Sequence, residues 1–243
     1  MGNKKTGSVI ARLVFILSLP AASSASIAAT TLSATIGGAP TVAGTNVNFD
    51  SLAQTGGTTD EGITVSFSGI GAGTIAVPNV VGKYAAPYIS GGNGTLFGNT
   101  QADGLGVTPY LSTGIGQVTL QLGQYHSYFG LLWGSVDDYN TLSFFDGSTL
   151  LFSYTGLDVD QLAKGNQGAG GTFYVNINSD TGFNRVVASS TRYGFEFDNV
   201  ALEANLVPPA EVLPIPEPHT YVMLLAGLVL LGRIAARHHR TNA

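Results

Sequence analysis

The sequence predicts an all-β protein whose body is a β-sandwich of the jelly-roll kind. Glycine is abundant, at 33 residues, and charged residues make up only 10% of the chain, whereas an ordinary soluble domain has about 25%. Short segments of alternating apolar and polar residues recur along the middle of the chain, with turn-forming residues between them. Within the body, only residues 158–164 are convincingly helical.

The candidate strands follow one another at short intervals. Residues 63–67 and 117–122 alternate strictly between apolar and polar side chains. The other candidates are residues 127–136, 141–145, 149–154, 172–177, 185–189 and 193–200. Asp146-Gly147 predicts a tight hairpin, and residues 179–182 predict a turn between two strands. The size of the region and the absence of a long internal repeat predict a single domain over residues 29–206.

Residues 1–28 have the pattern of a secretory signal peptide. Three basic residues precede a short apolar run at residues 13–19, which ends at Pro20. Small residues follow, with candidate cleavage sites after Ala25 and Ala28. The apolar run is too short to span a bilayer core of about 30 Å, so we expect a cleaved signal rather than an anchor.

The C-terminal tail has three consecutive parts. Residues 207–215 are rich in proline, which predicts an extended, exposed linker. Pro216-Glu217-Pro218 comes next, and residues 216–240 contain an apolar run at 221–232 followed by a basic end. The arginines of this basic end are Arg233, Arg237 and Arg240.

The apolar run predicts a single transmembrane helix. A helix over residues 221–236 is about 24 Å long, and the side chain of Arg233 can extend to the membrane surface. The three arginines act as a stop-transfer signal and stay in the cytoplasm. Since the signal peptide directs the body outward, we expect the body outside the inner membrane and the C-terminal end inside.

The tail closely resembles the PEP-CTERM sorting domain. The resemblance covers about the last 28 residues, and it depends on Pro216-Glu217-Pro218 standing just before an apolar run with a basic end. His219 and Thr220 depart from the small residue that the family often has there. The resemblance implies recognition by an exosortase, a membrane transpeptidase that cleaves near the motif. It also implies a Gram-negative host that makes exopolysaccharide and biofilm.

These features predict an exported, exosortase-processed surface or extracellular-matrix protein without enzymatic activity. Its expected partners are the exosortase, the inner membrane and exopolysaccharide. Its expected final location is the cell surface, the outer envelope or the extracellular space. One alternative is a carbohydrate-binding module for exopolysaccharide, and a third hypothesis is a hydrolase.

The body has a second, shorter resemblance. Residues 48–52 and 195–200 look like paired elements in other exosortase-dependent surface proteins, and residues 128–142 are also similar to them. The resemblance implies a lectin-like jelly roll and assigns no binding residue.

The charge of the body argues against nucleic acid as a partner. Residues 29–205 contain four basic and thirteen acidic residues, which gives a net charge of −9. An acidic surface repels a phosphate backbone.

Few residues of the body have catalytic potential. The chain has no cysteine, which excludes disulfides, thiolate zinc sites and cysteine nucleophiles. His126 is the one histidine of the body, and no Gly-x-Ser-x-Gly motif accompanies it. We therefore expect neither an enzyme nor a cofactor, with Ca²⁺ as the one exception to consider.

Two binding sets are candidates. Asp137, Asp138 and Asn140 supply closely spaced oxygens for Ca²⁺, and the alternative is a polar turn after a strand. Asp158 and Asp160 form a second acidic pair, for which the alternative role of Asp158 is a helix N-cap. Trp133 with Tyr139 is a candidate platform for sugar rings, and the alternative for Trp133 is a place in the core.

Overall fold

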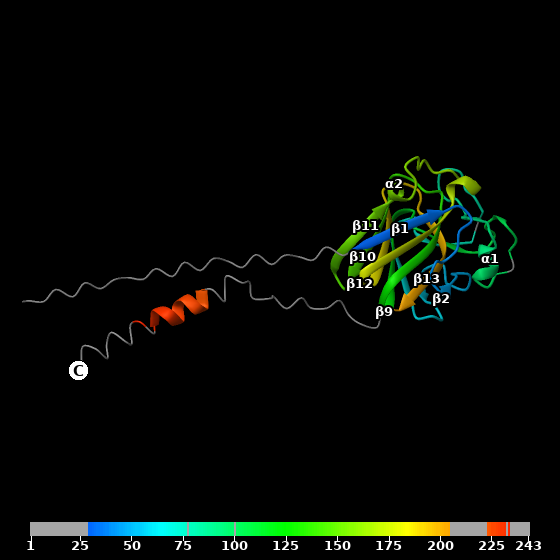
Figure 1. Cartoon of the computed structure of the whole chain (residues 1–243). Helices are drawn as coiled ribbons and strands as arrows, with labels where there is room; N and C mark the ends of the chain where they lie inside the picture. Colours follow the sequence, from blue (N-terminus) through cyan, green and yellow to red (C-terminus); the bar gives the residue numbers. More distant parts are fainter. Residues whose placement is uncertain (1–28, 77, 100, 205–222, 232, 234–243) are drawn as a thin grey trace, which may run out of the picture. The chain divides into compact units, whose positions relative to one another are not determined.

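The computed structural model describes residues 29–204, except 77 and 100, together with residues 223–231 and 233. The described residues of the body belong to one compact unit, and the helical residues 223–231 belong to a second (Figure 1). The predicted signal peptide, linker, Pro216-Glu217-Pro218 motif, Arg237 and Arg240 lie outside the described residues.

The body consists mainly of strands. They are β1 (Thr30–Thr35), β2 (Thr45–Val47), β3 (Gly57–Thr58), β4 (Thr64–Ile70), β5 (Gly73–Ile75), β6 (Tyr88–Ile89), β7 (Gly104–Leu105), β8 (Tyr110–Ser112), β9 (Ile115–Gly134), β10 (Asn140–Asp146), β11 (Thr149–Thr155), β12 (Phe173–Ser190) and β13 (Glu196–Ala204). The helical segments are α1 (Asn93–Leu96), α2 (Gly156–Val159) and the 3₁₀ turn η1 (Ala169–Gly171).

Eleven strands join in one large antiparallel sheet. Its main path runs β11-β10-β12-β9-β13-β8-β5, while β1 pairs with β12, β2 with β13, β4 with β9, and β3 with β4. Strands β6 and β7 form a separate pair. The mostly β prediction is confirmed, whereas the division into two packed sheets stays a prediction.

Strands β9 and β12 are much longer than the sequence predicts. They span 20 and 18 residues, and each includes two segments that the sequence presents as separate strands. The predicted turn at residues 179–182 is instead an irregularity within β12, marked by a register shift between Asn178 and Phe183. Here the hydroxyl of Ser179 bonds to the backbone of Thr181, so a local turn-like contact forms while the strand continues.

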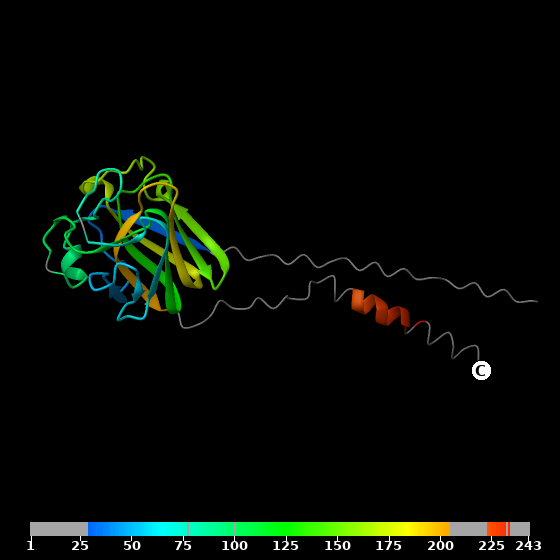
Figure 2. The same ribbon diagram turned by 180° about the vertical axis from the view of Figure 1, so that it is seen from behind.

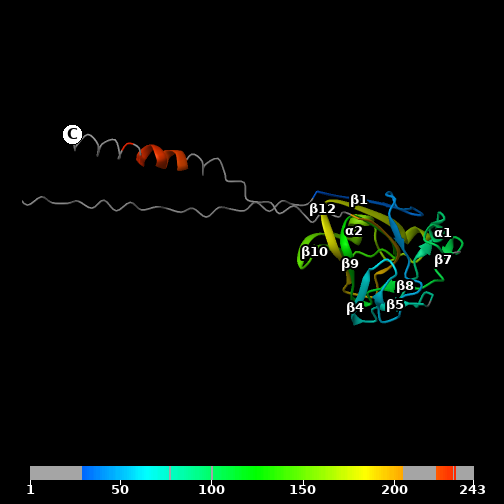
Figure 3. The same ribbon diagram turned by 90° about the horizontal axis from the view of Figure 1, so that it is seen from below.

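The two halves of each long strand share one core. The first half of β9 pairs with β4 and the second half with β13. Both halves nevertheless send apolar side chains, such as Leu120 and Leu131, into the same main core. At its centre the ring of Phe144 contacts the rings of Phe129, Phe152 and Phe183. Figures 2 and 3 show the strands wrapping around this interior, with β4, β5 and β8 opposite β1 in Figure 3.

The outer face of part of the sheet is also covered. A second apolar cluster is formed by Ile89, Phe97, Tyr128, Leu132, Tyr174 and Ala201. Ile89 and Phe97 belong to the segment that contains α1, and the other four residues belong to β9, β12 and β13. The α1 segment therefore covers these strands on the side away from the main core.

The local predictions have mixed outcomes. Strands β10 and β11 form the predicted hairpin, with Asp146 paired to Thr149 and a positive φ of 54° at Gly147. The predicted helix at residues 158–164 is wrong in position, because α2 covers Gly156–Val159. Thr155 is its N-cap and Asp158 is its third residue, so the two side chains form a capping box.

The second unit contains the described part of the tail. Residues 223–231 and 233 are helical. Among the described residues, no helix has both the length and the apolar character needed to cross a membrane. The predicted transmembrane helix, residues 221–236, includes residues on both sides of the described helical segment.

Candidate functional site

The predicted Ca²⁺ residues lie at the turn between β9 and β10. The Tyr139 hydroxyl lies 2.7 Å from a carboxylate oxygen of Asp137 and 3.0 Å from the Tyr193 carbonyl oxygen. Asn140 instead accepts a bond of 2.8 Å from the Ser190 hydroxyl, and Asp138 is exposed.

Asp137 and Asn140 are thus engaged with different protein partners. Within the described part of the chain, no three His, Cys, Asp or Glu residues are grouped to hold a metal ion. These contacts are those of a hydrogen-bonded polar turn, and Ca²⁺ binding by this segment stays a prediction.

The sugar platform is wrong for Trp133. This side chain is 0% exposed, and its ring stacks on Phe195 with centroids 4.1 Å apart and planes at 12°. It lies in the main core because β9 is a central strand. Tyr139 is partly exposed, and the guanidinium carbon of Arg192 lies 5.2 Å from the centre of its ring.

A buried acid close to this turn was missed by the sequence analysis. Glu196 in β13 is 1% exposed, and burial raises its pKa to about 8, with a contribution from the charge of Asp137. Its carboxyl group accepts hydrogen bonds from the backbone N–H of Ala85 and the hydroxyl of Ser112. No local signal was available, because strand alternation places Glu196 on the face opposite the core residues Phe195 and Phe197.

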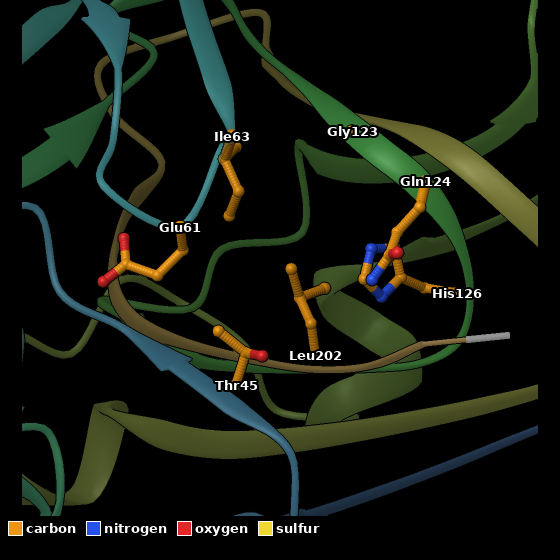
Figure 4. Close-up of a pocket in the computed structure, with 7 residues that line it drawn as sticks. All are labelled: Thr45, Glu61, Ile63, Gly123, Gln124, His126 and Leu202. Atoms are coloured by element: carbon orange, nitrogen blue, oxygen red, sulfur yellow. The ribbon is translucent and has the colours of Figure 1, made fainter. Parts of the chain in front are cut away.

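His126 faces a small hollow of about 250 Å³ at the bend of β9 (Figure 4). The residues that line it are Thr45, Glu61, Ile63, Gly123, Gln124, His126 and Leu202. Figure 4 shows His126 and Gln124 on one side and Glu61 on the other, with the carboxylate of Glu61 pointing away from the imidazole. The hollow is smaller than the roughly 300–1,000 Å³ of typical ligand pockets.

The hydrogen bonding of His126 defines its proton state. Its Nδ1 atom lies 3.1 Å from the Glu203 carbonyl oxygen, and since a carbonyl only accepts, Nδ1 carries the proton. Burial lowers the pKa of the imidazole, so the neutral ring retains a basic Nε2. A catalytic histidine generally needs an orienting acid and a nucleophile in reach. The one acid lining this hollow points elsewhere.

The body and the tail together define the class of protein. A β-rich body followed by a proline-rich linker and an apolar, basic tail is typical of exported proteins that are sorted by their C-terminus. Residues 214–240 match the family model of the PEP-CTERM protein-sorting motif. This match contains Pro216-Glu217-Pro218 and the three arginines.

The chain therefore carries a PEP-CTERM sorting motif. This motif implies export and C-terminal membrane anchoring before cleavage by an exosortase. The match covers the tail and leaves the body unassigned. Searches of curated proteins and of solved structures gave no match.

Proposed function

We propose that this protein is an exported cell-surface or extracellular-matrix protein, processed at its tail by an exosortase, with a body that acts by binding or structure rather than by catalysis. The observation that carries the proposal is the match of residues 214–240 to the PEP-CTERM motif. Association with biofilm exopolysaccharide is the role that best fits this class of sorting signal.

The absence of enzymatic activity is proposed from the hollow around His126. The imidazole faces no described acid that could orient it. The buried acid Glu196 is enclosed and does not line this hollow. The alternative of a carbohydrate-binding module loses its main candidate residue, because Trp133 lies in the core.

The chemistry of the motif indicates how the exosortase recognises it. Prolines on both sides of Glu217 favour an extended backbone. Transfer of the Glu217 carboxylate into hydrocarbon is costly, so this residue marks the depth at which the membrane segment begins. Any acidic residue at this position would set the depth of the membrane segment. Recognition by an enzyme instead requires Glu217 with a proline on each side.

The test is to replace Glu217 in a host that carries the exosortase. We expect Glu217→Gln, and more strongly the replacement of all three motif residues by alanine, to leave export intact and to block removal of the tail. Glu211→Gln is the matched control, because it removes an equal charge outside the matched residues and should leave cleavage unchanged. The measurement is the mass of the mature protein.

The same measurement in a host without the exosortase completes the experiment. There we expect the intact tail on every variant. Removal of the tail in both hosts, or from the triple-alanine variant, would show that Pro216-Glu217-Pro218 is only a linker and would overturn the proposal.

A further inference from the structure

Two polar residues of β13 project from the side of the sheet that faces away from the main core. Asp198 and Asn199 lie at a β-bulge, where the register against β9 shifts and Asn199 has a φ of 51°. The residues that flank them, Phe197 and Val200, both belong to the main core. The bulge therefore places two adjacent polar side chains on the same outer face, where Asn199 contacts Asn93 of α1.

A second carboxylate, that of Asp50, belongs to the residue after Phe49, whose backbone N–H donates to Asp198. Asp50 follows β2, which pairs with β13, and its charge contributes to raising the pKa of Asp198 after the larger effect of burial. Asp198 is 2% exposed, and its carboxylate accepts hydrogen bonds from the backbone N–H groups of Phe49 and Asn199. No lysine or arginine is among the groups that shift the pKa of either acid.

Two oxygen atoms of this cluster have no hydrogen-bond donor within the described residues. They are Oδ1 of Asp50 and Oδ1 of Asn199, and both atoms are buried. Asn199 is 0% exposed. Its side-chain nitrogen donates to Oδ1 of Asn93, and its side-chain oxygen has no donor. A buried acceptor without a partner costs about 1–3 kcal/mol, which a bound cation would offset.

We propose that Asp50, Asp198 and Asn199 form a binding site for Ca²⁺. Carboxylate and amide oxygens are the ligands that this cation prefers, and its flexible shell of 6–8 oxygens accepts backbone carbonyls and water in the remaining positions. Zn²⁺ prefers nitrogen and sulfur ligands. Mg²⁺ demands a near-ideal octahedron and gives up its water reluctantly.

The site would tie together three separate parts of the body. Asp50 belongs to the segment after β2, Asp198 and Asn199 belong to β13, and Asn93 connects Asn199 to α1. A cation here links the segment after β2 to β13 and, through Asn199, supports the contact with α1. This site is distinct from the turn that contains Asp137, and its proposal is independent of how the tail is processed.

The test measures Ca²⁺ binding to the purified full-length chain by calorimetry, together with its melting temperature in 5 mM CaCl₂, in 5 mM MgCl₂ and in EDTA. We expect Ca²⁺ to bind and to raise the melting temperature, and Mg²⁺ to have a smaller effect. In Asp198→Asn the side chain keeps its shape and loses its charge. We expect this variant to lose at least tenfold in Ca²⁺ affinity and most of the melting-temperature shift.

Asp60→Asn is the matched control, because it removes an exposed acid that belongs to neither candidate Ca²⁺ segment. It should bind Ca²⁺ like the wild type. Asp50→Asn provides a second variant in case Asp198→Asn fails to fold in EDTA, as judged by circular dichroism. The proposal is overturned if the wild type binds no Ca²⁺, or if a folded Asp198→Asn or Asp50→Asn binds it with unchanged affinity.

Discussion

At the scale of single residues, His126 couples the stability of the body to pH. Burial lowers its pKa in the folded protein, while its pKa in the unfolded chain is about 6.5. The unfolded chain therefore takes up a proton first as the pH falls. The stability that depends on neutral His126 is present above about pH 6.5 and is lost as the pH falls through its folded-state pKa.

We predict that His126→Asn removes this pH dependence while retaining an amide donor for the Glu203 carbonyl. From pH 7 to pH 5, the unfolding free energy of the wild type relative to the variant should fall, by up to about 1.4 kcal/mol per pH unit. Urea unfolding at several pH values measures it. The variant serves as the reference because buried Glu196, whose pKa is raised, changes stability in the opposite direction. Parallel curves for the two proteins would contradict the prediction.

The residues of the candidate site could be predicted from the sequence only where their surroundings are local. Pro216-Glu217-Pro218 was found because the motif and the apolar run are neighbours in the chain. The proximity of Asp50 and Asp198 depends on the pairing of β2 with β13, which was indicated only by the resemblance of residues 48–52 and 195–200 to paired elements of other proteins. The burial of Trp133 likewise depends on strands that come from both sides of β9 in the sequence.

At the scale of elements, the β10–β11 hairpin shows what local turn chemistry can specify. Gly147 has a φ of 54°, and no atom lies within 4 Å of the position that a Cβ would occupy there. Its N–H donates to Oδ1 of Asn184 at 2.8 Å. A substitution at this position therefore tests backbone strain with little steric interference.

We predict that Gly147→Val destabilises the body by about 1–2 kcal/mol, the cost of a left-handed conformation for a residue with a side chain. Gly147→Asn should cost much less, because asparagine tolerates this conformation. Thermal or urea unfolding of both variants gives the comparison. Equal destabilisation by valine and asparagine would show that the strain argument is wrong.

The hairpin was predicted correctly because its signal lies within a few residues. The full lengths of β9 and β12 were not predicted. Residues 179–182 have the composition of a turn, and the hydroxyl of Ser179 makes a local contact of that kind. Pairing with β9 on both sides of the irregularity keeps β12 continuous. The sequence pattern shows that residues 179–182 favour a turn, and it contains no direct signal for the pairing of β12 with β9.

At the scale of the whole molecule, the body should fold without its flanking segments. The eleven-stranded sheet and the main core are formed by residues between Thr30 and Ala204. We predict that a fragment of residues 29–206 gives a circular dichroism spectrum dominated by sheet and unfolds in one cooperative transition. Its melting temperature should match that of the full chain under the same conditions. A mainly helical or random-coil spectrum would contradict this prediction.

The strand pairings also place the start of the first strand, β1, and the end of the last strand, β13, at the same end of the sheet. Thr30 pairs with Ser179, the neighbouring Asn178 pairs with Tyr128, and Tyr128 pairs with Glu203. The chain thus enters and leaves the body at the same end, three strand spacings or about 14 Å apart. The turn after β9 and the turn before β13 lie at the opposite end of these strands.

The turns at the opposite end, with Asp138, Tyr139 and Arg192, are accessible to solvent. Exposed residues of these turns can therefore vary, and change what the body contacts, without disturbing the end at which the chain enters and leaves it.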